Sequence, residues 1–436
     1  MLASTDTPLR RKAILLFWLP LAATWLMMSL EGPYIAAIVA RLPSAAHSLA
    51  AYGVATSLAW LIESPIMMLL SASAALVRDR ASYLALRRFA FLLNGVVTLG
   101  MIVLALPGVF PFVGERLIGL PPEISRLAHA ASGAMILWPA AIGYRRFYQG
   151  ILVRHHLTNR VAYGTVIRLV TMSVTAAILA FTTDMPGAVL GATSMTVGVI
   201  FEASASRWMA RHVVRDLMND PHVADGTLLR LREIARFYYP LALTSILSMA
   251  LGPLVTFGLG RSRAPIESLA VWPVVNSMLF MFRSGGVAFQ EVAIALSGRR
   301  REHEHQVRET GVQLGLVFSI ALAFVAFTPL DVVWFAHVAG LPPRLVEYAV
   351  WPVRVMAALP FLEYLLSIQR AQWILSHRTK MITAATAIET GGLALTLIVA
   401  IGVFDLVGAL AGALAMVIGR IAANGFLYLR RGAAAA

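Results

Sequence analysis

Charged side chains inside long apolar segments are the residues of this sequence whose chemistry most needs an explanation. A charge at the bilayer centre costs at least about 2.5–3.5 kcal/mol, so such residues pair with each other, face water or contact a bound molecule. Glutamates there can exchange protons, and arginines suit the bidentate binding of carboxylate or phosphate. Six acids and seven bases occupy such positions: Glu31, Glu63, Glu202, Glu291, Glu363 and Glu389, and Arg145, Arg146, Arg168, Arg283, Arg354, Arg370 and Arg420.

Other kinds of chemistry find little support in the sequence. The chain has no cysteine, which excludes disulfides and zinc–thiolate sites. It has no Walker motif for ATP, no nucleophile–base–orienter set and no nucleic-acid-binding motif. His303-Glu304-His305 has no further ligands beside it, so we predict no metal site. We expect a protein that is not an enzyme, holds no cofactor and binds no nucleic acid.

The elements that position these charges are predicted to be membrane-spanning helices. Of the 436 residues, 59% are hydrophobic and 13% are charged, whereas soluble domains carry about 25% charged residues. The prediction is an all-α polytopic membrane protein of twelve spans, each near the roughly 20 residues that cross a bilayer. The predicted spans are Ile14–Val39, Leu49–Leu76, Phe89–Val113, Leu127–Leu152, Val161–Phe181, Pro186–Met209, Phe237–Gly260, Leu269–Leu296, Val312–Val333, Tyr348–Leu375, Ile382–Val403 and Leu406–Leu429.

Arginine is distributed unevenly between alternate loops, and this asymmetry predicts the orientation of the chain in the membrane. The net charge of +14 comes almost entirely from arginine, concentrated in one set of loops and both tails. By the positive-inside rule, both termini lie in the cytoplasm, and the composition suits a bacterial inner membrane. Residues 219–236 carry loop signals and are predicted to be a cytoplasmic linker, with a short amphipathic helix from Leu228 to Tyr238. This linker separates an N-terminal six-helix lobe, 1–218, from a C-terminal one, 237–436.

The two halves are an internal repeat. A single shift of the sequence along itself places Gly32-Pro33 on Gly252-Pro253, and a shift one position longer superposes the glycine ladders of the sixth and twelfth spans. Because each half has an even number of spans, the repeats are parallel and related by a pseudo-twofold axis along the membrane normal. Such repeats place a substrate site between the lobes, which rock against each other.

The repeat brings opposite charges to equivalent positions. Glu63 aligns with Arg283, and Arg168 aligns with Glu389 after a short gap. One hypothesis is that Glu63 and Arg283 face a central cavity and are coupled across it. The alternative is that each pairs within its own half.

Other intramembrane charges form weaker patterns, each with an alternative. Arg145, Arg146 and Gln149 share about one turn, although the arginines could instead snorkel to the interface. Glu363 and Arg370 share a helix face, and Glu202 and Arg420 could form an ion pair. Glu31 precedes Gly32-Pro33, where a helix should break. A freed carbonyl there would suit a proton or cation site, or the break only shapes the helix. The tryptophans Trp18, Trp138, Trp334 and Trp351 are predicted to anchor the protein at the membrane interfaces.

Short motifs give the sequence a family resemblance. They are Pro20-Leu21 with Thr24, Leu49-Ala50-Ala51-Tyr52-Gly53 with Ser57-Leu58, Tyr239-Pro240-Leu241-Ala242-Leu243, Pro352-Val353-Arg354 leading to Pro360, and Gly408-Ala409 with Gly412. With two six-span lobes, the chain resembles the MOP flippase superfamily, which includes the MATE exporters, and its closer likeness is to the progressive ankylosis protein branch. The resemblance implies a rocking transporter with a central cavity. It further implies organic anions such as citrate as substrates, or cationic drugs driven by protons or sodium, as in MATE relatives.

Together these observations predict a monomeric transporter, surrounded by membrane lipids, that exports small organic anions. Arg283 and Arg146 are the first candidates for binding the substrate, with Glu63, Arg145, Gln149, Glu363 and Arg370 beside them. Glu63 or Glu31 would couple transport to H+ or Na+. Arg168, Glu389, Glu202 and Arg420 are predicted to be intramembrane charge pairs. The alternatives are a multidrug exporter of cations, a flippase for lipid-linked precursors, and a membrane scaffold or enzyme.

Overall fold

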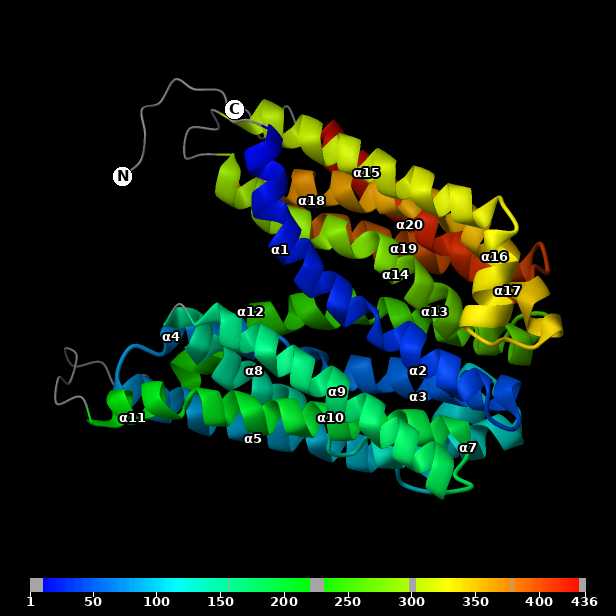
Figure 1. Ribbon diagram of the computed structural model, residues 1–436, viewed down its shortest axis with the longest axis horizontal. Coiled ribbons are helices and arrows are strands. Elements are labelled where there is room, and N and C mark those ends of the chain that lie inside the picture. The colour runs from blue at the N-terminus through cyan, green and yellow to red at the C-terminus, as the bar shows by residue number, and fades with distance from the viewer. Residues whose placement is uncertain are drawn as a thin grey trace. The chain divides into compact units, whose positions relative to one another are not determined.

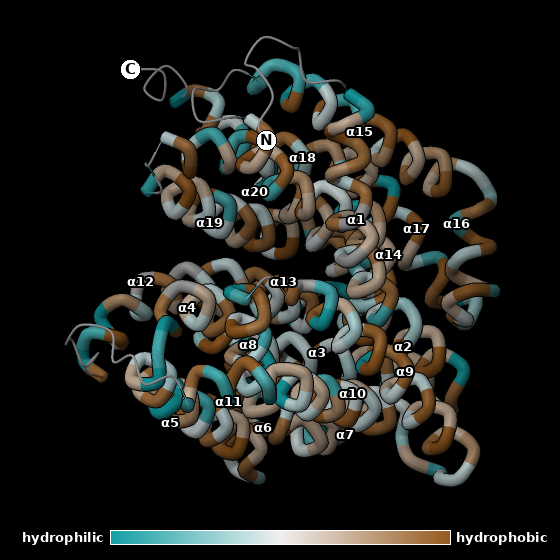
Figure 2. The backbone as a smooth tube through the Cα atoms, turned by 60° about the vertical axis from the view of Figure 1, so that its left-hand side comes forward, coloured by the Kyte–Doolittle hydropathy of each residue, from teal (hydrophilic) through white to brown (hydrophobic). Residues whose placement is uncertain are grey.

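The computed structural model describes residues 11–155, 157–219, 231–297, 303–376, 378 and 380–430. Within these ranges the chain is helical, with one isolated bridge between Arg263 and Val407 and no strand (Figure 1). Hydrophobic residues follow most of the length of the helices, as Figure 2 shows. A helix satisfies its own backbone hydrogen bonds, so bundles of apolar helices are the architecture expected in a membrane. The chain is an integral membrane protein.

Eleven helices of the described residues are long and apolar enough to cross a membrane, one fewer than the twelve predicted. The difference lies in the predicted span Leu127–Leu152, which is divided into α7 (Pro122–Ala134) and α8 (Trp138–Arg154). Neither piece alone reaches the length of a span. Pro139, near the start of α8, has no N–H to continue a helix across the break.

The helices are grouped into two compact units that differ from the predicted lobes. Unit 1 consists of residues 1–37 and 262–436, and unit 2 of residues 38–261. Most of the first span of the N-terminal half therefore belongs to unit 1, with the rest of the C-terminal half, and the first span of the C-terminal half belongs to unit 2. The chain passes between the units at residues 37/38 and 261/262. The predicted linker 219–236 joins parts of unit 2, and its residues 220–230, with most of the predicted amphipathic helix, lie outside the described residues.

Unit 2 holds the second to sixth spans of the first repeat and the first span of the second. The helix α2 (Glu31–Ala40) crosses the boundary into it. Its other elements are α3 (Ala45–Glu63), η1 (Ser64–Ile66), α4 (Leu69–Leu76), α5 (Arg80–Leu104), α6 (Val109–Pro111), η2 (Phe112–Ile118), α7, α8, α9 (Thr158–Thr182), α10 (Gly187–Met209), α11 (Arg211–Asn219), α12 (Leu231–Met249) and α13 (Leu251–Gly260).

Unit 1 holds the first span of the first repeat and the remaining spans of the second. Its elements are α1 (Arg11–Ser29), α14 (Pro265–Leu296), α15 (Glu304–Ala326), α16 (Leu330–Val332), η3 (Val333–Val338), α17 (Pro343–Val355), η4 (Met356–Ala358), α18 (Leu359–Leu375), α19 (Lys380–Gly402) and α20 (Gly408–Leu429).

The backbone repeats its irregular features as well as its helices. Ser44 and Ala264 occupy equivalent positions of the two repeats, and both have φ near +55°. The left-handed glycines Gly119 and Gly340 are likewise equivalent. The π-helical segments η2 and η3 recur in the same register. The sequence repeat is therefore also a repeat of structure.

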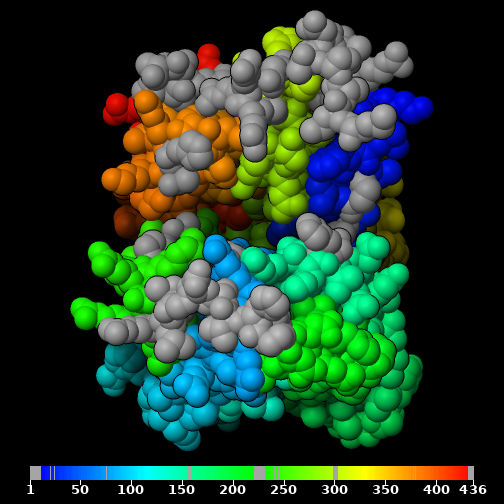
Figure 3. Space-filling view, turned by 90° about the vertical axis from the view of Figure 1, so that its left-hand side faces the viewer, coloured from blue at the N-terminus to red at the C-terminus, as the bar shows by residue number. Residues whose placement is uncertain are grey.

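The first span of each repeat packs on the second span of the other repeat. In unit 1, α1 lies against α14, where the Trp18 indole N–H donates to the Gly285 carbonyl over 3.0 Å. Figure 3 shows the dark-blue atoms of α1 beside the yellow-green atoms of the α14–α15 region. In unit 2 the hydroxyl of Tyr238, from α12, donates to the Pro65 carbonyl over 2.5 Å. The two donors occupy equivalent positions of the repeats, and so do the two acceptors, so the same packing contact recurs in each unit.

Candidate functional site: two intramembrane charge clusters

Unit 2 contains a cluster of charges centred on Glu202, whose residue is fully buried. Arg145 donates to Glu202 over 2.5 Å, and Gln149, one turn further along α8, donates over 3.1 Å. The Arg168 Nε lies 3.5 Å from the same carboxylate. We name Arg145, Gln149, Arg168 and Glu202, with the nearby Glu63 and Arg146, the Glu202 cluster. Glu202 is thus neutralised by arginines from two other helices, as a buried charge requires.

Glu63 has a different kind of partner. It is the last residue of α3, and it accepts a hydrogen bond from the indole N–H of Trp138, which is 3% exposed. Arg145, Arg146 and Arg168 act on it electrostatically. No arginine among the described residues lies within ion-pair distance of the Glu63 carboxylate, so its bonded donor is a neutral group.

Arg146 is the one arginine of this cluster that has no carboxylate partner among the described residues. Among the described residues, its only polar contact is from Nη2 to the Met67 sulfur over 3.9 Å, and its Nε is buried without an acceptor. A thioether is a weak acceptor. Arg146 therefore keeps most of its capacity to bind an anion.

Unit 1 contains the corresponding cluster, centred on Glu363. Arg283 donates to Glu363 through Nε and Nη2, over 2.9 and 2.5 Å. Arg420 donates to the same carboxylate over 3.0 Å and, through Nε, lies 2.9 Å from Glu389. We name Arg283, Glu363, Arg420 and Glu389, with the nearby Arg370, the Glu363 cluster. Its first four members form a continuous chain of alternating charges.

Arg370 is the unneutralised arginine of the second cluster. It interacts electrostatically with Glu363 and Glu389. Within the described part of the chain, its only recorded hydrogen bond is to the Thr386 hydroxyl over 3.5 Å, and its Nε is buried without an acceptor. Each cluster therefore has three arginines and two glutamates, with one arginine left over.

Glycines let the helices that carry these charges approach closely. A Cβ on Gly198 of α10 would lie 3.1 Å from the Arg168 carbonyl of α9, and a Cβ on Gly419 of α20 would lie 2.7 Å from the Glu389 carbonyl of α19. Small residues allow such packing between membrane helices. Glu202 lies about one turn after Gly198 on α10, and Arg420 directly follows Gly419 on α20. The glycine ladders noted in the sequence thus bring the charged residues into contact.

The predicted charge pairs form with other partners. Arg168, Glu389, Glu202 and Arg420 all take part in ion pairs, but Glu202 pairs with Arg145 and Arg168 instead of Arg420. Arg420 pairs with Glu363 and Glu389. The reason is topological, because Glu202 and Arg420 belong to different units and each has nearer partners in its own.

The remaining predicted residues are dispersed. Glu31 is buried at the start of α2, after the predicted helix break, which the structure places at Leu30. Glu291 is exposed on α14. Arg354 lies 3.2 Å from Asp331, a partner that the sequence analysis missed because Asp331 lies at the end of a span.

Two tryptophans predicted to anchor the membrane interface have another role. Trp138 and Trp18 are both buried and donate hydrogen bonds inside their units, whereas Trp351 is exposed as predicted. Trp138 belongs to the candidate site. The signal that could have found it is its position directly before Pro139, which starts the helix that carries Arg145, Arg146 and Gln149.

Comparisons with known proteins identify the fold. No family model and no curated protein sequence matches the chain. An inward-facing multidrug resistance MATE family transporter of the MOP superfamily superposes with a TM-score of 0.71, at 14% identity, over 94% of this chain and 95% of that one. The lipid II flippase MurJ, in an inward closed conformation, gives 0.73 at 13% identity over 95% and 87%.

A third structure has the same fold and a distinctive description. It is a MOP superfamily transporter from Pyrococcus furiosus, with a TM-score of 0.67 and 16% identity over 98% of this chain and 96% of that one. Its binding pocket is described as having reverse polarity, which suggests a different function. This chain therefore has the fold of MATE and other MOP superfamily transporters. The resemblance to the progressive ankylosis branch stays a prediction.

Proposed function

We propose that this protein is a secondary active transporter of small organic anions, such as citrate or phosphate-containing metabolites. Its two units would expose the substrate alternately to the two sides of the membrane. The fold supports transport, because the solved structures that share it are described as transporters and a flippase.

The observation that carries the proposal is the pair of unneutralised arginines, Arg146 in unit 2 and Arg370 in unit 1. Two arginines in each cluster are held by glutamates, and the third has no carboxylate partner among the described residues. An unpaired charge within a bilayer is costly, so a bound anion is the simplest compensation. Arginine suits carboxylate and phosphate because its planar guanidinium can bind both oxygens at once.

The same geometry changes the ranking of the predicted binding residues. Arg283 was a first candidate, but both its Nε and its Nη2 already donate to Glu363. Arg145 and Gln149 are likewise bonded to Glu202. We therefore assign anion binding to Arg146 and Arg370, and a structural role to the neutralised arginines and to Gln149.

Export of organic cations is the competing function, and the charge balance opposes it. A cation site requires an excess of carboxylate, whereas each cluster has an excess of one arginine. The Pyrococcus furiosus transporter, with its pocket of reverse polarity, supports the view that this fold does not dictate the sign of the substrate. Flipping of a lipid-linked precursor remains an alternative outcome of the test below.

Coupling to a proton gradient is assigned to Glu63, with Glu31 as the second candidate and Na+ as the alternative ion. Glu63 is bonded to a neutral indole, so its protonation breaks no ion pair. Protonation of Glu363 would instead break its ion pairs with Arg283 and Arg420 and leave Arg283 without a carboxylate partner among the described residues. Glu63 is accordingly the cluster carboxylate best suited to change its charge during a cycle.

The test is flux into proteoliposomes of purified protein, with and without a pH gradient, for labelled citrate, labelled pyrophosphate and a cationic dye. We expect anion flux in the wild type and a loss of at least about tenfold in Arg146→Gln and Arg370→Gln, since a charge-assisted hydrogen bond contributes about 1.5–3 kcal/mol. Arg87→Gln and Arg344→Gln serve as matched controls, because these arginines are exposed and lie outside the clusters.

Two results would overturn the proposal. Dye flux without anion flux would indicate a cation exporter. Movement of neither class by folded protein, together with scrambling of a polyprenyl-diphosphate lipid, would indicate a flippase.

A further inference from the structure

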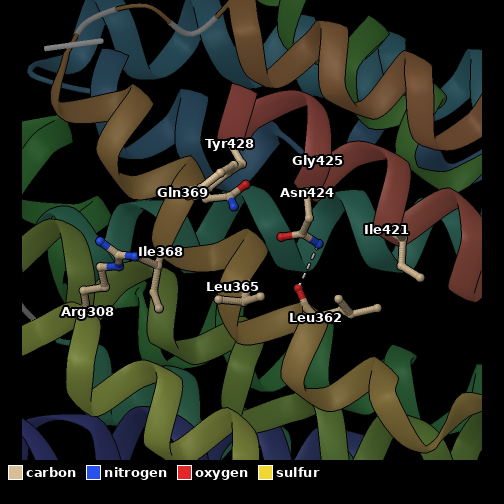
Figure 4. A pocket seen from close by; sticks show the side chains of 9 residues that line it. All are labelled: Arg308, Leu362, Leu365, Ile368, Gln369, Ile421, Asn424, Gly425 and Tyr428. Atoms are coloured by element: carbon tan, nitrogen blue, oxygen red, sulfur yellow. Dashed lines mark hydrogen bonds between the residues drawn. The ribbon is translucent and has the colours of Figure 1, made fainter. Parts of the chain in front are cut away.

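A half-open groove of about 320 Å³ lies in unit 1 between α15, α18 and α20, apart from the Glu363 cluster (Figure 4). Its walls are mostly apolar, and two of its lining residues, Ile421 and Tyr428, are exposed. The groove therefore opens on the surface of the unit. Its polar lining residues gather toward one end, where α15 begins and α18 and α20 end.

Two buried amide oxygens in the groove have no hydrogen-bond donor in the described part of the chain. They are Gln369 Oε1 and Asn424 Oδ1, on residues that are 7% and 6% exposed. The orientation of the Asn424 amide is fixed, because its Nδ2 donates to the carbonyls of Leu362 and Arg420 over 3.2 and 2.9 Å. Its oxygen must then point the other way, as Figure 4 shows. A buried acceptor without a donor is costly, so these two atoms call for a ligand that donates hydrogen bonds.

Arg308 supplies a positive charge to the same groove. It is exposed on the first turns of α15, and no carboxylate among the described residues lies within ion-pair distance of it. Arg308, Gln369 and Asn424 lie roughly 6–9 Å along their helices from the ends nearest the groove, at 1.5 Å per residue. That depth matches the polar headgroup layer of a bilayer, and the exposed Tyr428 suits the same layer.

Gly425 keeps the groove open. A Cβ built on this residue meets no atom within 4 Å, so the glycine faces empty space and is not needed for packing between helices. A side chain at this position would project into the groove instead of into the core.

We propose that the groove binds a phospholipid whose headgroup carries an anionic phosphate and neutral hydroxyl donors, and that the occupant is phosphatidylglycerol. Its phosphate pairs with Arg308, its glycerol hydroxyls donate to Gln369 and Asn424, and the start of one acyl chain lies along Leu362 and Leu365. The net charge of −1 balances Arg308. An ethanolamine headgroup would bring an ammonium close to that arginine, and a choline headgroup has no donor for either amide oxygen.

The test measures lipid retention and needs no transport assay. The full-length protein is reconstituted in nanodiscs of dioleoylphosphatidylcholine with a minor fraction of dioleoylphosphatidylglycerol, and lipids that stay bound are counted by native mass spectrometry. We expect the wild type to retain one phosphatidylglycerol in preference to phosphatidylcholine. Arg308→Gln should weaken retention about tenfold, as for a lost charge-assisted hydrogen bond, and Gln369→Leu should remove the preference while leaving phosphatidylcholine retention unchanged.

Gly425→Leu separates occupancy of the groove from damage to the fold. Leucine is a better helix former than glycine, so the variant should fold and lose the bound lipid because its side chain fills the groove. Gly391→Leu is the matched control, since Gly391 is another open helical glycine, on α19 and outside the groove. Equal retention of phosphatidylcholine or phosphatidylethanolamine by the wild type, or unchanged phosphatidylglycerol retention in both Arg308→Gln and Gly425→Leu, would overturn the proposal.

Discussion

The two clusters have the same composition and a different connectivity. Each contains three arginines and two glutamates, but in unit 1 the charges alternate along one chain of ion pairs, from Arg283 through Glu363 and Arg420 to Glu389. In the Glu202 cluster, Glu202 is paired with arginines and Glu63 is bonded to the indole of Trp138. Four charges of the Glu363 cluster therefore form one network of ion pairs, whereas the Glu202 cluster contains a carboxylate with no arginine within ion-pair distance among the described residues.

The second spans show the same contrast in their backbones. The helix α3 ends at Glu63, and Pro65 follows in a short 3-10 turn before α4 begins. The equivalent helix α14 continues without interruption past Arg283. The second span is thus interrupted beside a titratable group in unit 2 and continuous in unit 1. Under the proposal that Glu63 couples transport to an ion, this interruption is where unit 2 would change shape.

The largest effect is expected when the charges of Glu63 and Arg283 are exchanged. The double variant Glu63→Arg/Arg283→Glu would place a fourth arginine in the Glu202 cluster and a glutamate beside Glu363 in unit 1. Uncompensated buried charges cost about 3–5 kcal/mol each when a partner is lost, so we expect little folded protein and no rescue of either single variant. Size-exclusion profiles in detergent would measure this. Recovery of folded, active protein in the double variant would instead favour coupling between Glu63 and Arg283 across a shared cavity.

The second-largest effect is expected when an ion pair of the Glu363 cluster is broken. Glu363→Gln removes the carboxylate partner of Arg283 and one of the two carboxylate partners of Arg420. We expect about 3–5 kcal/mol of destabilisation, measured as the loss of thermal stability in detergent. Glu291→Gln is the control, because Glu291 is exposed on α14. Its stability should stay within about 0.5 kcal/mol of the wild type. Equal stability of Glu363→Gln and Glu291→Gln would mean that the ion-pair network does not stabilise unit 1.

Glu63→Gln should affect function more than stability. Glutamine can still accept the Trp138 hydrogen bond, so the protein should fold, but it cannot be charged. We expect citrate flux to lose its dependence on a pH gradient, measured in the proteoliposomes described above. Unchanged gradient dependence in both Glu63→Gln and Glu31→Gln would contradict proton coupling through these residues.

The smallest effect is expected when the hydrogen bond between Arg370 and Thr386 is removed. Thr386→Val removes a hydrogen bond of 3.5 Å, at the limit of useful length. We expect a stability change below about 0.5 kcal/mol and unchanged anion affinity, because a contact of this length contributes little to the position of the Arg370 guanidinium. A large loss of affinity would show that Thr386 positions the guanidinium.

Much of the fold could be predicted from the sequence, because its signals are periodic and repeated. The apolar spans, the helix break near Gly32-Pro33, which the structure places two residues earlier at Leu30, and the glycine ladders all report local rules of helix formation and packing. The divided fourth span was missed because its apolar residues continue through the break. The exchange of first spans between units was missed because it depends on which helices meet, and contacts such as that of Trp18 with Gly285 join residues far apart in the sequence.

The members of the candidate site could be predicted, but their partners could not. The cost of buried charge singles out every arginine and glutamate of both clusters. Which arginine remains unneutralised depends on helix packing, since Arg283 and Glu363 meet through contacts between α14 and α18. For the same reason Arg370, and not Arg283, joins Arg146 as the proposed anion ligand.

Equilibrium binding of labelled citrate to detergent-solubilised protein tests the central claim most directly, because it separates recognition from coupling. We expect the wild type to bind, Arg146→Gln and Arg370→Gln each to lose at least about tenfold in affinity, and the exposed-site control Arg344→Gln to match the wild type. Binding that is unchanged in both cluster variants, with the proteins shown to be folded, would contradict the account.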